Sequence, residues 1–426
     1  MSFNVPRLHP VLVVDPLIDF DTNPMFTVGK AANNNQYYAV NSNNFSQSSC
    51  SFQVNLNGSS SVSDRNFLLS CPVAVAFTGT VSIGTNLLQS NFDAFASLPL
   101  GKAMASLTVT LGTQQVTILP SDMLRCFERY IPMMRKYLDN SQSPIMPDYS
   151  QNYADLTATQ RNPLNTFNFG VDQIQSRGAF PITVVSNTST AATITAVLTE
   201  PLFISPLLQN FSRKCGLSHL TNIAINISWN SGNLLSRMWR HNPTNTTLTA
   251  VNVSFPSAPT LYVVQSLPSL LMPVPPVVTL DYDEIISYPN APQSAPAYGA
   301  SAQATSQTLQ LSRIPKEAYL YVTDSNGNAT FNQNIPDRFY VINAVVCSFN
   351  TQTLLSGASI YDLYKINCSN DSNQTWLDYS GLAMGGASAM GVIGTSGSPL
   401  CLKFGKDIPL PSESWAVGKF VCPCTF

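Results

Sequence analysis

Side chains that could act as a nucleophile, a general base or a metal ligand are few in this sequence of 426 residues. Serine and cysteine nucleophiles need a base within hydrogen-bond reach, and the chain has three histidines. His9 lies in a proline-containing N-terminal arm, His219 opens an expected strand, and His241 lies in the polar turn RHNPTN. None has a nucleophile elbow nearby. The sequence therefore predicts no catalytic residue, and we expect that the protein is not an enzyme.

Cysteines are the other candidate ligands. Cys422 and Cys424, separated by one proline, could bind a metal or form a disulfide, with Cys401 or Cys368 joining them. A zinc site requires a second closely spaced pair, so two small apolar side chains at a strand end are the favoured interpretation. The nine cysteines are odd in number and irregularly spaced, which predicts free buried thiols in a reducing compartment. We expect neither a metal nor a cofactor.

Asp281, Asp283 and Glu284 form the acidic cluster of the chain. Two carboxylates could act as acid and base on a glycosidic bond, or contribute to a Ca²⁺ site. However, Asp281 and Asp283 share one face of an expected strand, while Glu284 faces the other way. Because Ca²⁺ needs six or more oxygens from a shaped loop, a solvated strand entrance is the favoured interpretation.

Glycines and aromatic residues suggest two further sites. Residues 381–398 are rich in glycine but lack the G-x-x-x-x-G-K-[ST] pattern of a phosphate-binding loop, so we expect a flexible contact loop. Aromatic side chains that could form a sugar-binding platform are expected in the core instead. They are Trp229, Trp239 and Tyr262.

Composition favours a structural role. Charged residues make up 10% of the chain, so Asn, Ser, Thr and Gln must supply most of the polar surface. Such a surface suits a protein buried against neighbours, or an extracellular β protein. Strand-forming Tyr and Phe are abundant, and 30 Pro and 21 Gly are spread along the chain, which is typical of an all-β protein with many turns.

Charge and hydropathy limit the partners. The net charge is −2 without any cluster of Lys and Arg, so the chain has no basic arm for a nucleic-acid backbone. No apolar segment follows a basic start at the N-terminus, so no signal peptide is expected. The most apolar window, residues 267–280, is too short and too rich in proline to span a bilayer. Contact with a membrane stays open.

One structural unit recurs along the chain. Residues 98–130 first alternate apolar and polar side chains around Val109, as a half-buried strand does. A short helix is then expected, with Ser121 as its N-cap and apolar side chains at helical spacing. These side chains are Met123, Cys126, Phe127, Tyr130 and Met134. The same strand–loop–helix unit recurs in residues 335–366, where Leu363 and Tyr364 are expected to be buried as well.

Each half of the chain has about eight candidate strands in the same order. Within the first half lies a polar excursion, residues 139–180, which is too long for an ordinary connection and is expected on the surface. Eight antiparallel strands in two facing sheets form a jelly roll. We therefore predict an N-terminal arm and first jelly roll in residues 1–257, and a second jelly roll in residues 258–426. The clearest expected strands are 50–56, 64–80, 182–186, 191–198, 219–229, 248–255, 260–265, 282–288, 314–322, 400–410 and 415–421.

Two consecutive eight-stranded antiparallel jelly rolls, each with a short helix after its sixth strand, resemble the double jelly roll major capsid proteins of icosahedral viruses. The resemblance is carried by LTEPLFISPLL with GLSHLTNIAINISWN, IPKEAYLYV, the IPDRFYVINAVVCSFN–LYKI unit, and FGKDIPL. The family implies trimeric capsomers with a pseudo-hexagonal outline, and it has no catalytic residues to transfer. Neighbouring capsomers and minor capsid or penton proteins are the implied partners, in a virion shell assembled inside the host cell.

The expected function is that of a viral major capsid protein whose homotrimers tile an icosahedral shell. Two alternatives stay open. A carbohydrate-binding or hydrolysing β-sandwich protein would have a pocket near Asp281 and Glu284, with aromatic side chains facing solvent. A minor capsid or spike protein would be present in few copies per particle. The sequence does not identify the virus group or the host.

Overall fold

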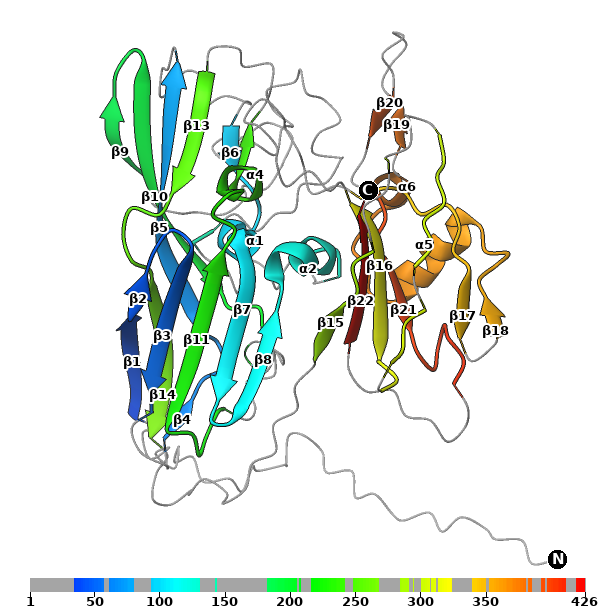
Figure 1. Cartoon of the computed structure of the whole chain (residues 1–426), viewed down its shortest axis with the longest axis horizontal. Helices are drawn as coiled ribbons and strands as arrows, with labels where there is room; N and C mark the ends of the chain where they lie inside the picture. The colour runs from blue at the N-terminus through cyan, green and yellow to red at the C-terminus, as the bar shows by residue number, and fades with distance from the viewer. Residues whose placement is uncertain are drawn as a thin grey trace, which may run out of the picture.

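The computed structural model is built mainly of β-strands, which confirms the predicted all-β fold. Figure 1 shows two groups of strands side by side, the first half of the chain in blue to green and the second in yellow to red. The described residues are 34–56, 61–79, 93–130, 142–143, 182–204, 207, 216–241, 248–267, 284–290, 294, 300–306, 308–311, 313–323, 339–349, 352–380, 382–384, 392–394, 397–410 and 419–425.

The first half forms two antiparallel sheets. The strands of the larger sheet are β1 (Asn34–Asn41), β4 (Val62–Ser63), β5 (Leu68–Gly79), β9 (Ile182–Asn187), β10 (Ala191–Pro201), β13 (Leu248–Ser254) and β14 (Thr260–Leu267). Those of the smaller sheet are β2 (Asn44–Phe45), β3 (Ser49–Asn55), β7 (Met104–Leu111), β8 (Gln114–Ile118) and β11 (Asn222–Trp229). The larger sheet has the order β1-β14-β5-β10-β9, with β13 beside β5 and β4 beside β14, and the smaller has the order β2-β3-β11-β7-β8.

The core of the first half lies between these sheets. Alternate side chains of β5, from Leu69 to Phe77, are at most 1% exposed, and those between them are half-buried except for Ser70, which is 8% exposed. Leu107 and Val109 of β7 and Ile225 of β11 face them from the smaller sheet. The period-2 pattern places these residues inward, because successive side chains of a strand point to opposite faces.

The expected strand–loop–helix unit contains one more strand. β7 and β8 form a hairpin, in which Gly112 takes a positive φ of 58° that suits glycine. Helix α2 (Pro120–Phe127) follows β8. The prediction of Ser121 as its N-cap is wrong: Leu119 holds that position and Pro120 begins the helix. Proline suits the first helical position because that N–H has no partner in the helix, and Ser121 is buried inside the first turn.

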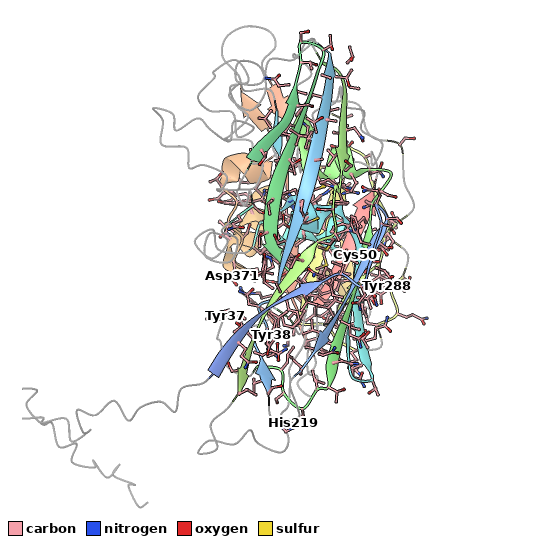
Figure 2. All side chains as sticks on the ribbon, turned by 90° about the vertical axis from the view of Figure 1, so that its left-hand side faces the viewer. Tyr37, Tyr38, Cys50, His219, Tyr288 and Asp371 are labelled. Atoms are coloured by element: carbon pink, nitrogen blue, oxygen red, sulfur yellow. The ribbon has the colours of Figure 1, made fainter. Side chains whose placement is uncertain are left out.

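Shorter elements lie at the end of the smaller sheet where β7 begins and β11 ends, as Figure 1 shows. They are β6 (Asp93–Phe95), which pairs with β12 (Trp239–His241), and the helices α1 (Pro99–Ala103) and α4 (Leu234–Met238). Figure 2 shows His219 at the opposite end of the molecule, and Tyr37 and Tyr38 on β1 at the edge of the larger sheet.

The second half has one larger sheet in the described residues, with the order β15-β22-β16-β21. Its strands are β15 (Ile285–Ser287), β16 (Glu317–Thr323), β21 (Leu400–Lys403) and β22 (Lys419–Thr425). The remaining elements are the hairpin strands β17 (Cys347–Phe349), β18 (Gln352–Leu354), β19 (Leu382–Met384) and β20 (Val392–Gly394), and the helices α5 (Ile360–Ser369) and α6 (Trp376–Ser380). Helix α5 follows the hairpin β17–β18, as α2 follows β7–β8.

Two predictions about the second half need correction. β22 runs parallel to β15 and β16, so this sheet is mixed and not wholly antiparallel. Long connections separate these strands, and the direction of a strand is fixed by sequence only where a short hairpin precedes it. β14, which the predicted boundary after residue 257 assigns to the second half, pairs with β1 and β5 in the first. The alternating pattern of β14 would be the same in either sheet, so the pattern alone cannot assign this strand to one half.

The two larger sheets share one strand order. In β1-β14-β5-β10 and in β15-β22-β16-β21, the first strand of the half lies beside the last. The last lies beside a strand with a proline in it or just before it, Pro72 within β5 and Pro315 before β16. The two halves therefore repeat in their sheet order as well as in their hairpin–helix units.

Candidate functional site at the junction of the two halves

Helix α2 joins the two halves of the chain. The end of α2 and the turn after it reach the sheet of the second half, as Figure 1 shows. The ring of Tyr319 on β16 lies edge-on to Phe127 and Tyr130, with centroids 5.0 Å and 5.1 Å apart. Such edge-to-face pairs add about 0.5–1.5 kcal/mol each to the burial of the rings. The buried members of this junction cluster are Cys126, Tyr130, Tyr319, Tyr321, Phe339 and Cys401.

Asn367 of α5 organises the polar contacts of the junction. Its Oδ1 accepts hydrogen bonds from the Tyr130 hydroxyl at 2.7 Å and from the Cys401 backbone N–H at 2.9 Å. Its Nδ2 donates to the Pro399 carbonyl oxygen at 3.0 Å. Asn367 is fully buried, so these bonds replace the water that its amide loses. One side chain thus connects α5, β21 and the turn after α2.

The turn at residues 128–130 is fixed on both sides. On the second half, the Asn373 backbone N–H donates to the Arg129 carbonyl oxygen at 2.6 Å, and the Arg129 guanidinium lies 5.8 Å from the centroid of the Phe339 ring. On the first half, Glu128 forms a fully buried ion pair with Lys102 at 3.0 Å. Buried ion pairs add little net stability, and we infer that this pair instead fixes the position of the turn relative to α1.

Helix α1 packs against α2. The Glu200 carboxylate accepts hydrogen bonds from the backbone N–H groups of Leu100 at 2.9 Å and Gly101 at 2.8 Å, at the N-terminus of α1. Burial raises the pKa of Glu200 to about 7, although these hydrogen bonds act in the opposite direction. A Cβ atom at Gly101 would lie 2.5 Å from Leu124 Cδ1, so glycine permits the close approach of α1 and α2.

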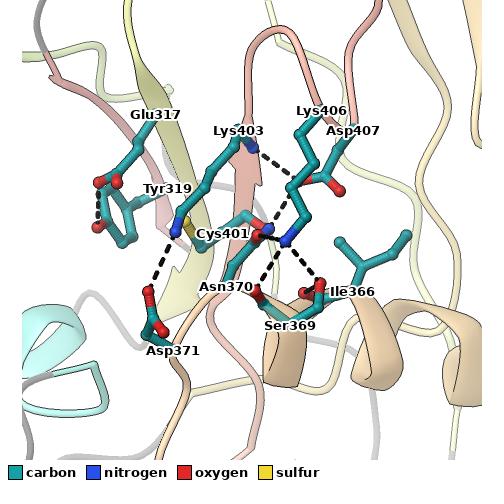
Figure 3. Close-up of polar contacts among 10 residues, drawn as sticks. All are labelled: Glu317, Tyr319, Ile366, Ser369, Asn370, Asp371, Cys401, Lys403, Lys406 and Asp407. Carbon is teal, nitrogen blue, oxygen red and sulfur yellow. Dashed lines mark hydrogen bonds and ion pairs between the residues drawn. The ribbon is translucent and has the colours of Figure 1, made fainter. Parts of the chain in front are cut away.

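A second polar network holds α5 to β21 (Figure 3). Asn370 Nδ2 donates to the Cys401 carbonyl oxygen at 2.8 Å and to Asp407 Oδ2 at 2.6 Å. Lys406 Nζ donates to the Ser369 carbonyl oxygen at 2.7 Å, which places a cation at the C-terminus of α5. At the other end, Ser359 caps α5 in a capping box with Asp362. The network fixes α5 against β21, and this holds Asn367 in the position where it accepts the hydrogen bond from Tyr130 of the first half.

The side chains of the junction are suited to packing the two halves together and not to nucleophilic or metal chemistry. Burial raises the pKa of the Cys401 thiol to about 12 and that of Cys126 well above its ordinary value, so both thiols are neutral near pH 7. Neutral thiols are poor nucleophiles and poor metal ligands. Within the described part of the chain, no three His, Cys, Asp or Glu side chains lie together as a metal site would require.

The structure separates the histidines and acidic residues that the sequence singled out. His9, Asp281 and Asp283 lie outside the described residues. Glu284 is exposed just before β15. His219 precedes β11 with a positive φ of 58°, and His241 ends β12 opposite Asp93. His219 and Glu284 thus lie on different halves of the chain.

The cysteines and aromatic residues have mixed outcomes. Cys422 and Cys424 lie in β22, opposite Leu320 and Val322, while Cys368 on α5 is exposed. Cysteines 50, 71, 126 and 401 are free and buried, as expected. Most of residues 381–398 lies outside the described residues.

The prediction that aromatic residues lie in the core is confirmed for Trp229 and Trp239, which are 4% and 3% exposed. It is wrong for Tyr262, which is 46% exposed because it lies on the outward positions of β14.

Sequence reasoning missed the role of Asn367. A signal was present: Asn367 follows Leu363 by four residues, so both lie on the same face of α5. A polar side chain on an apolar helix face indicates a buried hydrogen-bond partner, here Tyr130 from the other half. The predicted burial of Met123 and Leu363 is confirmed, and Phe127 and Tyr364 are half-buried. No helix in the described residues is long and apolar enough to cross a membrane.

Comparisons with known proteins agree across most of the chain. The model for the first domain of the Sputnik virophage major capsid protein matches residues 7–272, and the model for the C-terminal domain of major capsid protein V20 matches residues 285–421. The putative capsid protein V20 of Sputnik virophage is 32% identical over 434 residues, which cover 97% of this chain and 72% of that protein.

Solved structures of virophage capsids also match this chain. The chain matches the cryo-EM structure of the Sputnik virophage with a TM-score of 0.81 and 29% identity, covering 97% of this chain and 85% of that one. It matches the crystal structure of the mavirus major capsid protein with a TM-score of 0.69 and 13% identity, covering 96% of this chain and 86% of that one. The second match concerns the fold alone.

Proposed function

The chain belongs to the virophage major capsid proteins and is part of the virion shell, and from this premise we propose that it assembles as homotrimeric capsomers that tile an icosahedral shell. Each capsomer would contain six similar halves and have a pseudo-hexagonal outline. Neighbouring capsomers and minor capsid or penton proteins are the proposed partners. The proposed role is structural, without catalysis.

The observation that carries this proposal is the repeat of the two halves around one junction. Their larger sheets share a strand order, and each half has a hairpin followed by a helix. This repeat supports a double jelly roll, with a boundary that we propose between β14 and β15, in place of residue 257. Two similar halves in one chain allow three copies to present six similar units around a threefold axis. A charged content of 10% supports a surface that is covered by neighbours.

Assembly of the purified protein tests this function. We expect native mass spectrometry to give three times the chain mass of 46.2 kDa, and electron micrographs of concentrated samples to show shells or hexagonal arrays. A monodisperse monomer over a wide concentration range, without shells, would contradict the proposal. The same preparation should be inactive toward a panel of glycosides, since a hydrolase would turn over one of them.

A further inference from the structure

The larger sheet of the first half has an outer face without charge. Its seven strands contain a single charged residue, Glu200, and this side chain is buried on the inner side. Antiparallel sheets that face water normally alternate apolar with polar or charged side chains. Here the outward positions include Tyr37, which is 79% exposed, Tyr262, and the half-buried Ala74 and Thr195. We call this surface the outer face.

Tyr37 and Tyr262 belong to the same surface. In the register of β1 and β14, Ala39 lies opposite Tyr262 and Tyr37 lies opposite Val264. Directly paired residues share a face, and so do residues two apart in one strand. Two exposed tyrosines on an uncharged sheet form a surface suited to an apolar or aromatic partner.

The corresponding face of the second half is already covered. In β21, Leu400 and Leu402 point into the core of their own half, and Cys401 between them points to the junction. Tyr319 and Tyr321 of β16 share that outward face; Tyr319 packs against Phe127 at the end of α2, and Tyr321 packs against Phe339 in the same cluster. Because β5 and β16 hold equivalent positions in the two sheets, the outer face is the equivalent of the surface that α2 covers.

Helix α5 is the equivalent of α2, and it presents aromatic side chains to solvent. Tyr361 in its first turn is 50% exposed, and Trp376 at the start of α6 is 40% exposed. Their ring centroids lie 5.3 Å apart, and the half-buried Tyr364 lies 5.3 Å from Trp376. We call Tyr361, Tyr364 and Trp376 the aromatic patch. Its nearby charges, Asp362 and Lys365, are opposite in sign, so the patch is suited to an uncharged partner.

We propose that the aromatic patch of one copy docks on the outer face of a second copy, so that the contact between copies repeats the contact that α2 makes within one copy. This inference rests on the proposed function and names the surfaces that would join its subunits. The two surfaces differ, so the contact is heterologous, and it forms a closed ring when three copies complete the rotation. The equivalence is one of position: Phe127 and Tyr130 lie at the end of α2, whereas Tyr361 lies at the start of α5.

Charged substitutions on each surface test the contact. Trp376→Glu in the patch and Tyr262→Glu on the outer face should each weaken trimer formation at least tenfold in native mass spectrometry and light scattering. Val184→Glu is the matched control, since Val184 is 49% exposed and pairs with the inward residue Ile194, on the opposite side of the same sheet. The control should form trimers as the wild type does, and the thermal unfolding of all three variants should stay close to that of the wild type.

A double variant makes the test specific. Trp376→Glu combined with Tyr262→Lys places opposite charges across every proposed contact, so trimers should return. Wild-type trimers together with fully trimeric single variants would overturn the inference and leave the proposed function intact. A wild type that never forms trimers would refute the proposed function itself. Variants that form trimers but no shells would show that the patch joins capsomers, which also overturns the contact proposed here.

Discussion

At the scale of single residues, the junction depends on one amide. Asn367→Leu removes the acceptor of the Cys401 N–H and one of the two acceptors of the Tyr130 hydroxyl, which also reaches the Pro399 carbonyl oxygen at 3.1 Å. An unsatisfied buried N–H costs about 1–3 kcal/mol and one lost hydrogen bond about 1 kcal/mol, so we expect a loss of roughly 2–4 kcal/mol in the free energy of unfolding. Denaturant titration measures it. Tyr130→Phe, which removes one hydroxyl and leaves the Cys401 bond intact, should lose only about 1 kcal/mol. Equal losses in both variants would contradict the central position of Asn367.

Glu200 gives the stability of the protein a pH dependence. Because burial raises its pKa to about 7 in the folded chain, the folded state holds this proton more tightly than the unfolded state does. The protonated Glu200 therefore makes its full contribution to the free energy of unfolding below about pH 4.5. This contribution, about 3 kcal/mol, is lost as the pH rises through 7.

Free energies of unfolding at pH 5 and pH 8 measure this contribution. Glu200→Gln cannot titrate, so its stability should fall less between the two pH values than that of the wild type. The comparison uses only the change with pH, because the amide also alters the hydrogen bonds to α1. Identical pH profiles for the two proteins would mean that a group other than Glu200 causes the change of stability with pH.

At the scale of elements, the contact between α1 and α2 depends on the absence of a side chain. Gly101→Ala would place a Cβ atom 2.5 Å from Leu124 Cδ1 and 3.4 Å from Glu200 Oε2, so the buried Leu124 side chain or one of the helices must shift. We expect a loss of about 1–3 kcal/mol, measured by thermal unfolding. Gly232→Ala is the control, because no heavy atom lies within 4 Å of its added Cβ, and its effect should stay within about 0.5 kcal/mol. Similar effects of the two substitutions would contradict close packing at Gly101.

Sequence patterns predicted the strands that have one face in the core and the other toward solvent. β5 and β11 alternate apolar and polar side chains, and both have one face in the core. β8 was missed because Gln114, Gln115 and Thr117 are exposed, and the strand is defined by its hairpin with β7. α2 was placed correctly, but its first residue depends on whether Pro120 or Ser121 begins the helix. The physical limit is that periodicity records burial and does not record pairing.

The candidate site shows the same limit at longer range. The sequence predicted a helix with Cys126 and Tyr130 among the apolar side chains at helical spacing; both are buried, but Tyr130 lies in the turn after α2. It did not predict that Tyr319 and Asn367, more than 180 residues away, would cover these side chains. Periodicity can mark a side chain as buried, but it cannot name the partner that buries it. The assignment of β14 to the wrong half and the direction of β22 have the same cause.

At the scale of the whole molecule, the two halves should unfold together because the junction couples them. Phe127 lies against Tyr319 across this junction, so Phe127→Asp would bring a charge without a partner into an aromatic cluster and cost several kcal/mol. We expect one calorimetric transition in the wild type and two in this variant, one for each half. Leu119→Asp is the control, since it adds the same charge at a 41% exposed residue, where aspartate suits the N-cap of α2. Two transitions in the wild type would show that the halves are independent, and the junction would then lose its role in fixing their orientation for assembly.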